Sequence, residues 1–392
     1  MELRSLQIAN FRNITEMELV LPAGLVVIAG ENAQGKSNLL EAVYLLALSK
    51  SYRASTDREL VSWATVESGG YAMVSGMVTR RRGEVEIRVG LECLVGQGVD
   101  AKVRKRVRIN GVGRRASDLL GLLNAVFFSA DDVELVFGSP SVRRRYLDVM
   151  LAQVSRAYVR ALQRYQKVLL QRNYLLRNIR DGRAKEAELG YWDESLCQEG
   201  GTVLEIRYQA MERLMGLVQE NFKRLVGGGP EIDVEYVATA PAGQGEDGHR
   251  FQQALMKALQ RSKRQEQMLA QTVVGPHRDD LRLVLDGVEM SRHASRGQAQ
   301  LAALALRLAE GAYLSERSGD PPVLLLDDVL SELDERRRSL VLEAVEAYPQ
   351  VLVTTADEKD VSEAHLDGAH RLRMVEGRIG VAVDDVAFAS GA

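Results

Sequence analysis

The feature that most constrains this chain is residues 26–40, where an apolar strand, a short loop and an apolar helix follow one another. The loop Gly30-Glu-Asn-Ala-Gln-Gly35-Lys36-Ser37 fits the pattern G-x-x-x-x-G-K-[ST]. Glycines at this spacing let backbone N–H groups approach a phosphate closely, and the helix that follows directs the positive end of its dipole at the same anion. A chance glycine-rich turn does not account for the strand before the loop and the helix after it. The run therefore predicts a phosphate-binding P-loop.

The residue types in this loop indicate a nucleoside triphosphate as the ligand. Lys36 is a cation that can reach the β- and γ-phosphates, and the Ser37 hydroxyl is placed to bind a Mg²⁺ that bridges phosphate oxygens. The predicted contacts in the loop are Gly30, Glu31, Asn32, Ala33, Gln34, Gly35, Lys36, Ser37 and Asn38.

The length of 392 residues exceeds one ordinary hydrophobic core and predicts about two to three domains. The two cysteines, Cys93 and Cys197, lie far apart without a C-x-x-C pattern, which argues against a disulfide framework or a zinc cluster. No apolar stretch approaches the roughly 20 residues of a membrane span, and the first residues do not resemble a signal peptide. We expect a soluble cytoplasmic protein.

Around the P-loop helix, the N-terminal part of the chain is rich in predicted strands. Residues 1–21 alternate as two short strands, and further strands are expected at 71–79, 85–94 and 103–109. Turns are expected at 80–83 and 96–98, and Asn110-Gly111 predicts a tight hairpin. These strands predict a β-rich lobe.

The net charge of −3 gives no general attraction to nucleic acid, but residues 102–115 hold seven cations and no acid. Alternate residues of a strand share one face, so this run concentrates positive charge. A solvated sheet edge is one interpretation, and a surface for a phosphate backbone is the other, which the missing counter-charge favours. The predicted DNA-binding residues are Lys102, Arg104, Lys105, Arg106 and Arg108.

The middle of the chain predicts helices. Apolar residues at steps of three and four run through 147–169 and 204–225, which indicates an antiparallel helical arm, and residues 251–271 predict another helix after a surface loop at 241–250. A hairpin at 281–289 is expected to return the chain to the β lobe. His277 lies near Asp279 and Asp280, but this pattern is a weak metal signal, and a local hydrogen-bonding role is favoured.

Two further segments indicate a composite site. Residues 295–298 open a helix, which is either an anion site or an ordinary capped helix start. Residues 322–328 form an apolar strand that ends in Asp327 and Asp328, where carboxylates are costly unless they meet a cation. Asp327 is suited to Mg²⁺ held jointly with Ser37, and Asp328 to a general base. The alternation of strands and helices after residue 295 implies a largely parallel sheet.

These segments carry a family resemblance. Residues 30–37, 295–298, 324–328 and 331–334 match, in order, the Walker A, signature, Walker B and D-loop motifs of the ABC-type ATPases. The opening Ile8-Ala-Asn10-Phe11-Arg12 resembles the SMC-like branch of that superfamily. Residues 128–132, 138–148 and 275–280 resemble the RecF family of recombination mediators, and the resemblance extends over essentially the whole chain.

The resemblance implies an α/β fold, with an ABC/SMC-like P-loop ATPase head, a β-rich lobe and an inserted helical arm. The expected head comprises residues 1–128 and 271–392, and the expected arm residues 129–270. It implies ATP and Mg²⁺ as cofactors and an ATP-dependent homodimer, in which the signature of one subunit completes the site of the other. The residues that would do so are Ser295, Arg296, Gly297 and Gln298.

The function implied by the resemblance is ATP-dependent DNA binding in DNA repair, replication and recombination and in the SOS response. The dimer would clamp DNA at single-strand/double-strand junctions of gaps and help load the RecA recombinase with RecO and RecR. Another SMC-like or nuclease-associated ATPase acting on DNA is the alternative, whereas a transporter ATPase would need a membrane partner. Asp328 stands where the superfamily usually has Glu, and Thr354-Thr355 where it has a His, so we expect slow hydrolysis that serves as a switch.

Overall fold

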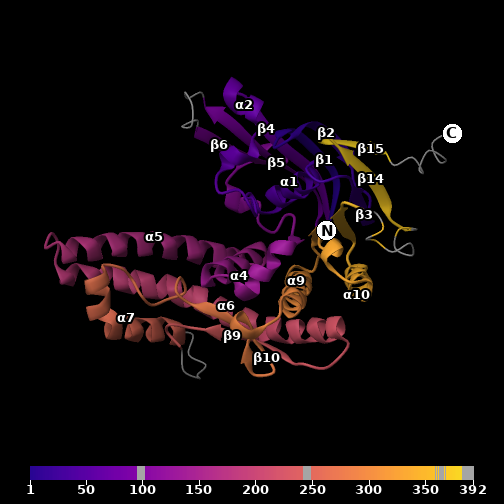
Figure 1. Ribbon diagram of the computed structural model, residues 1–392. Coiled ribbons are helices and arrows are strands. Elements are labelled where there is room, and N and C mark those ends of the chain that lie inside the picture. Colours follow the sequence, from indigo (N-terminus) through magenta and orange to yellow (C-terminus); the bar gives the residue numbers. More distant parts are fainter. Residues whose placement is uncertain are drawn as a thin grey trace. The chain divides into compact units, whose positions relative to one another are not determined.

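The computed structural model describes residues 1–94, 102–241, 249–357, 359, 361, 366 and 368–381 (Figure 1). The turn expected at 96–98 and most of the loop expected at 241–250 lie outside these residues. The chain forms two compact units. The first comprises Met1–Asp132, Arg224–Gly227 and Leu304–Ala392, and the second comprises Val133–Lys223 and Gly228–Ala303.

The first unit contains a six-stranded antiparallel sheet in the order β2-β1-β4-β5-β6-β7. Asn110 and Gly111 have positive φ angles of 49° and 74°, as the tight turn between β6 and β7 requires. The β-rich lobe and its hairpin are therefore confirmed. The strands are β1 (Glu2–Phe11), β2 (Ile14–Val20), β4 (Tyr71–Arg80), β5 (Gly83–Leu94), β6 (Lys102–Ile109) and β7 (Val112–Arg114).

The second sheet of this unit carries the P-loop strand. Its order is β15-β14-β3-β13-β12-β8, and all neighbours pair in parallel except β14 with β15, as the predicted alternation of strands and helices requires. Its strands are β3 (Gly24–Ala29), β8 (Ala125–Ser129), β12 (Val323–Asp327), β13 (Gln350–Thr355), β14 (His370–Val375) and β15 (Arg378–Val381). Buried apolar runs such as Val323–Leu326 are typical of parallel strands covered on both faces. Helices α1 (Lys36–Leu48), α2 (Trp63–Ser68) and α10 (Glu335–Val345) lie wholly in this unit.

The second unit is mainly helical and includes a small antiparallel sheet in the order β11-β10-β9. Its elements are α3 (Glu134–Phe137), α4 (Pro140–Val154), α5 (Arg156–Arg180), most of α6 (Leu189–Val226), α7 (Arg250–Leu269), α8 (Met290–His293), β9 (Ile232–Val237), β10 (Asp280–Leu285) and β11 (Val288–Glu289). Helix α9 (Arg296–Ser318) begins in this unit and ends in the first. In the described part of the chain, no helix combines the length and the apolar character that a membrane crossing needs.

Two predictions about this unit are wrong. The single helix expected at 147–169 is broken at Ser155, whose backbone is extended and whose hydroxyl accepts a hydrogen bond from Tyr158 N at 3.1 Å, so it caps a new helix. The hairpin expected to return to the β lobe pairs instead with β9, so residues 271–303 belong with the helices and not with the head as expected. Strand β9 was overlooked in the sequence, and its buried Ile232 and Val234 give β10 an apolar partner.

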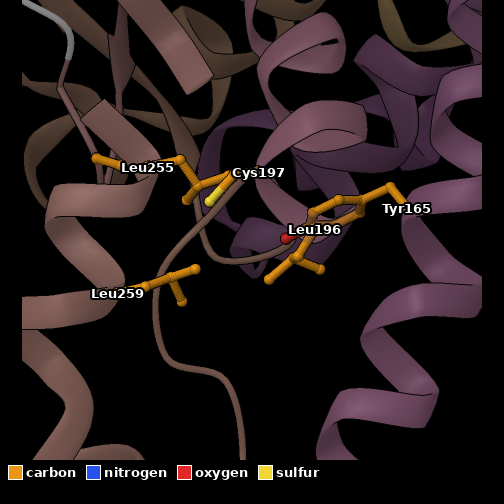
Figure 2. Close-up of a cluster of buried hydrophobic side chains, with 6 residues drawn as sticks. Tyr165, Leu196, Cys197, Leu255 and Leu259 are labelled. Carbon is orange, nitrogen blue, oxygen red and sulfur yellow. The ribbon is translucent and has the colours of Figure 1, made fainter. Parts of the chain in front are cut away.

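The helices of the second unit pack through a buried cluster (Figure 2). Tyr165 of α5, Cys197 of α6 and Leu255 of α7 meet there with Leu196, Ala240 and Leu259. A side chain at Gly200 would place its Cβ 2.7 Å from Leu255 and 3.0 Å from Tyr165, so close packing of the helices depends on a glycine. Cys93 and Cys197 are both free and buried.

Candidate nucleotide and DNA site

The P-loop joins β3 to α1, as its sequence pattern predicts. Steric constraints explain why two of its positions are glycine. Gly35 has φ of 110°, a left-handed conformation that favours glycine, and helix α1 begins at the next residue. At Gly30, an added Cβ would lie 2.4 Å from the carbonyl oxygen of Met374. The loop can therefore take this path only with glycine at both positions.

Lys36 lies folded over the loop that precedes it. Its Nζ donates hydrogen bonds to the carbonyl oxygens of Gly30 at 2.5 Å and Glu31 at 2.9 Å, and the residue is only 7% exposed. Burial lowers the pKa of this lysine, and the nearby Asp328 and Asp327 carboxylates oppose that shift. The ammonium group is thus held at the P-loop, where an anionic ligand would meet it.

Ser37 and Asp327, far apart in the sequence, are in direct contact. The Ser37 hydroxyl donates to Asp327 Oδ1 at 2.8 Å, and Thr354 donates to the same oxygen at 2.8 Å. A hydroxyl and a carboxylate are the hard oxygen ligands that suit Mg²⁺. The described residues hold no group of three or more His, Cys, Asp or Glu side chains arranged for a metal.

Tyr52, which the sequence analysis missed, also contacts the Asp327 carboxylate. Its hydroxyl donates to Asp327 Oδ2 at 3.3 Å, and its ring stacks on Phe127 with 3.8 Å between centroids. Burial raises the pKa of Tyr52, and the Asp327 charge adds to the shift, so the tyrosine stays protonated and can donate. Tyr52, Ser37 and Thr354 together orient both oxygens of Asp327.

Asp328, the predicted base, is held by its backbone at the end of β12. Its φ of 53° lies in the left-handed region, which is uncommon for residues other than glycine. Its N–H lies within hydrogen-bonding distance of two Thr354 oxygens, the carbonyl at 3.2 Å and Oγ1 at 3.1 Å. Thr354, where the superfamily resemblance leads one to expect a histidine, therefore fixes both acidic residues.

A buried ion network beside the P-loop was also missed. Glu41, fully buried in α1, accepts two hydrogen bonds of 2.9 Å from Arg12 and two more, of 3.1 and 2.9 Å, from Arg53, while Ser51 donates at 2.5 Å. Burial alone would raise the pKa of Glu41, but these hydrogen bonds lower it. Arg53 also donates to Asn38 in the first turn of α1. A single glutamate within the apolar run of this helix was the signal available in the sequence.

In the second unit, the signature segment forms a reciprocal helix cap. Ser295 N donates to Gln298 Oε1 at 2.8 Å, and Gln298 N donates to Ser295 Oγ at 3.2 Å, which satisfies two N–H groups at the start of α9. Arg296 and Gly297 form the first turn of this helix. The capped helix start is therefore present, and the predicted anion contact remains a prediction.

His277 and its acidic neighbours form hydrogen bonds within the second unit. The Nδ1 of His277 lies 2.6 Å from the Tyr165 hydroxyl and its Nε2 lies 3.2 Å from the Thr272 carbonyl. Burial lowers the pKa of His277 to about 4. Asp280 binds Arg143 through two hydrogen bonds of 2.8 Å, which tie β10 to α4. These contacts agree with the local role favoured over a metal site.

The basic strand β6 differs in part from its prediction. Its alternate residues Lys102, Arg104, Arg106 and Arg108 are exposed on one face, as expected. Lys105 points to the other face, where it pairs with Asp57 at 2.6 Å and donates to the Ser49 carbonyl at 2.6 Å, so it does not share the exposed face of the other four, and its contact with DNA stays a prediction. Arg106 pairs with Glu92 of β5 at 2.8 Å, so counter-charge comes from a neighbouring strand.

Comparison with known proteins agrees with this architecture. Residues 2–379 match the family described as RecF/RecN/SMC N terminal domain. The "DNA replication and repair protein RecF" of Chloroflexus aggregans is 39% identical over 97% of this chain and 99% of its own length. The protein of the same name from Herpetosiphon aurantiacus is 41% identical over 95% of this chain and 98% of its own.

Solved structures give the same result. The "Structure of the recombination mediator protein RecF-ATP in RecFOR pathway" is 31% identical, with a TM-score of 0.86 over 96% of each chain. An Smc head bound to the C-winged helix domain of ScpA, 18% identical over 97% of each chain with a TM-score of 0.54, shares the fold. The family match, with the P-loop and the Ser37–Asp327 contact on a parallel sheet, defines an ATPase head of the ABC/SMC class. Within that class, the chain belongs to the RecF family of DNA replication and repair proteins.

Proposed function

We propose that this protein is an ATP-dependent DNA-binding protein that acts in recombinational repair and at replication gaps. The observation that carries the proposal is the contact of Ser37 with Asp327, which joins the P-loop to the end of β12. ATP would lie on the P-loop against Lys36, and Mg²⁺ would bind Ser37 and Asp327 while neutralising phosphate charge. The solved RecF structure with ATP supports this cofactor.

Dimer formation is the second part of the proposal. The signature residues 295–298 of one subunit would complete the nucleotide site of its partner, because a capped helix N-terminus is a favourable place for a phosphate. ATP would then control closure of two heads on DNA at single-strand/double-strand junctions, with slow hydrolysis that reopens them. RecO and RecR would act with this clamp in loading RecA, in the RecFOR pathway to which the solved RecF protein belongs.

The proposed base gives one test of hydrolysis. Asp328→Asn keeps the size of the side chain and leaves the Asp327 contacts in place, but it removes the carboxylate that would accept a proton from water. We expect ATP turnover to fall by about 100-fold, within the range of general base catalysis, with ATP affinity nearly unchanged. Single-turnover hydrolysis and equilibrium ATP binding would measure the two effects, and unchanged turnover would place the base elsewhere.

The basic face of β6 gives the test of DNA binding. Replacing Arg104, Arg106 and Arg108 with alanine should weaken duplex binding to a similar extent for unrelated sequences, because phosphate contacts carry no sequence information. The log–log salt dependence should flatten by roughly 0.9 for each phosphate that the variant no longer binds. Fluorescence anisotropy at several salt concentrations would measure both, and ATP affinity should stay unchanged.

A matched control variant shows whether DNA binding depends on the β6 face itself or only on the net charge of the protein. Lys257, Arg261 and Arg264 are exposed on α7, and their replacement by alanine removes the same three charges from the net value of −3. We expect this variant to keep the wild-type affinity and salt slope. Equal behaviour of the two triple variants would show that the β6 face is a solvated sheet surface.

A further inference from the structure

The outer face of the first sheet has a hollow of about 420 Å³ over β4, β5 and β6. Gly90 lines this hollow, directly opposite Met73 on β4 and Arg106 on β6. Met73, Gly90 and Arg106 form a row across the three strands. Because Gly90 has no side chain, a gap lies between the side chains of Met73 and Arg106. The volume falls within the range of about 300–1,000 Å³ that is typical of small-molecule sites.

The two ends of the hollow differ in chemistry. At one end Tyr71, which is 59% exposed, lies opposite Glu92 on the neighbouring strand. At the other end Arg88 lies opposite Arg108, an arrangement that is unfavourable for like charges unless an anion joins them. The hollow thus offers an aromatic face at one end and paired guanidinium groups at the other.

Each end of the hollow holds one polar atom that can take part in a further hydrogen bond. Arg88 pairs with Glu86 through its Nη2 at 2.9 Å, but its Nε is buried without a hydrogen-bond partner in the described protein. Glu92 Oε2 is also buried and, although it lies 2.8 Å from Arg106 Nη2, it accepts no hydrogen bond from the described residues. Buried polar groups are normally hydrogen-bonded, so a ligand with an acceptor at the Arg88 end and a donor at the Glu92 end would satisfy both groups once these side chains turn toward the hollow.

Among the described residues, Arg108 forms no ion pair with a carboxylate, which leaves its charge available to a ligand. A planar ring with N–H donors, joined to an anion, matches the two ends of the hollow. Nucleotides have this chemistry, since a base can stack on an aromatic ring and a carboxylate can accept from a base amino group. Arginine binds phosphate through its planar set of donors.

We propose that this hollow binds one unpaired nucleotide of a DNA strand, with its base on Tyr71 and hydrogen-bonded to Glu92, and its phosphate at Arg88 and Arg108. This inference rests on the proposed DNA-binding function. A base within a duplex is stacked on its neighbours and paired, so it cannot enter the hollow without leaving the helix. The site therefore selects DNA that carries an unpaired nucleotide over fully paired DNA.

The test fills the hollow without removing a charge. Gly90→Val is compatible with the backbone, since its φ is not positive and the added Cβ would lie 3.9 Å from the Arg106 carbonyl, an ordinary contact. Gly380→Val, on β15 with a nearest contact of 4.0 Å, is the matched control. Anisotropy would compare a blunt duplex with the same duplex carrying a short single-stranded overhang, for each protein in the presence of ATP.

We expect the wild type and Gly380→Val to prefer the overhang duplex by about tenfold, the size of one stacked base, and Gly90→Val to lose that preference while binding blunt duplex normally. Tyr71→Ala should behave like Gly90→Val, and Tyr71→Phe should keep the preference because it keeps the ring. A preference that survives in Gly90→Val would overturn the inference and leave the proposed DNA binding intact. Failure of the wild type to bind either duplex would overturn both.

A free nucleotide has the same chemistry as a strand nucleotide, so a second measurement separates the two sources. Calorimetric titration of dAMP would use protein that carries Lys36→Ala, which removes the P-loop cation. We expect no dAMP binding at concentrations where the overhang preference is complete. Binding of dAMP that Gly90→Val abolishes, with the overhang preference unchanged, would show a free-nucleotide site and overturn the strand occupant.

Discussion

Replacing Lys36 with alanine will lower ATP affinity by about 10- to 100-fold, since a hydrogen bond to a charged group contributes roughly 1.5–3 kcal/mol and 1.4 kcal/mol is a tenfold change. Two features make the effect large. The ammonium is held at the loop by the Gly30 and Glu31 carbonyls, and the burial of Lys36 strengthens its interaction with an anion. Equilibrium binding of a fluorescent ATP analogue would measure the loss.

The control for this prediction is Lys50→Ala, which removes an exposed lysine just beyond the end of α1. It changes the net charge by the same amount, so it should keep the wild-type ATP affinity. Thermal unfolding of both variants would show that the chain remains folded. Comparable ATP affinity in a folded Lys36→Ala protein would contradict the assignment of the P-loop as the nucleotide site.

The P-loop head was predictable because its signals are local. The strand, loop and helix of residues 26–40 are recognisable from their own glycine spacing and periodicity. The apolar strand that ends in Asp327 is likewise recognisable from its own residues. The contact between Ser37 and Asp327 followed from the known chemistry of such motifs. The structure adds the reason for Gly30, which is the approach of the Met374 carbonyl from a strand over 340 residues further along the chain.

Contacts between distant segments explain most of what the sequence analysis missed. Glu41 stands out as a single acid in the apolar run of its helix, but only the fold brings the guanidinium groups of Arg12 and Arg53 to this buried carboxylate. The hairpin of β10 and β11 is visible in the sequence, but its partner β9 is not, because six residues of alternating character do not specify which strand they pair with. The partners of Lys105 were missed for a related reason, since Asp57 and Ser49 come from segments far from β6 in the sequence.

The second large effect concerns dimer formation. Ser295→Arg should preserve ATP binding by the single subunit and prevent ATP-induced dimers, because it replaces a hydroxyl with a bulky cation at the helix start that would close on the partner's nucleotide. The substitution also removes the Oγ that caps α9 at 3.2 Å from Gln298 N. Losing such a cap costs about 1 kcal/mol of stability. This loss of stability must be distinguished from the effect of Ser295→Arg on dimer formation.

Two further variants make that separation. Ser295→Ala loses the cap without adding bulk or charge, so it should share the stability loss of Ser295→Arg and still dimerise, more weakly, with ATP. Ser295→Thr keeps a capping hydroxyl and should dimerise normally. Sedimentation velocity with and without ATP, beside ATP binding at protein concentrations where the chain is monomeric, would measure association and nucleotide affinity independently. Equal loss of ATP binding in the monomer and in the dimerisation assay would show that residues 295–298 act within their own subunit, and a Ser295→Arg protein that dimerises like the wild type would remove them from the interface.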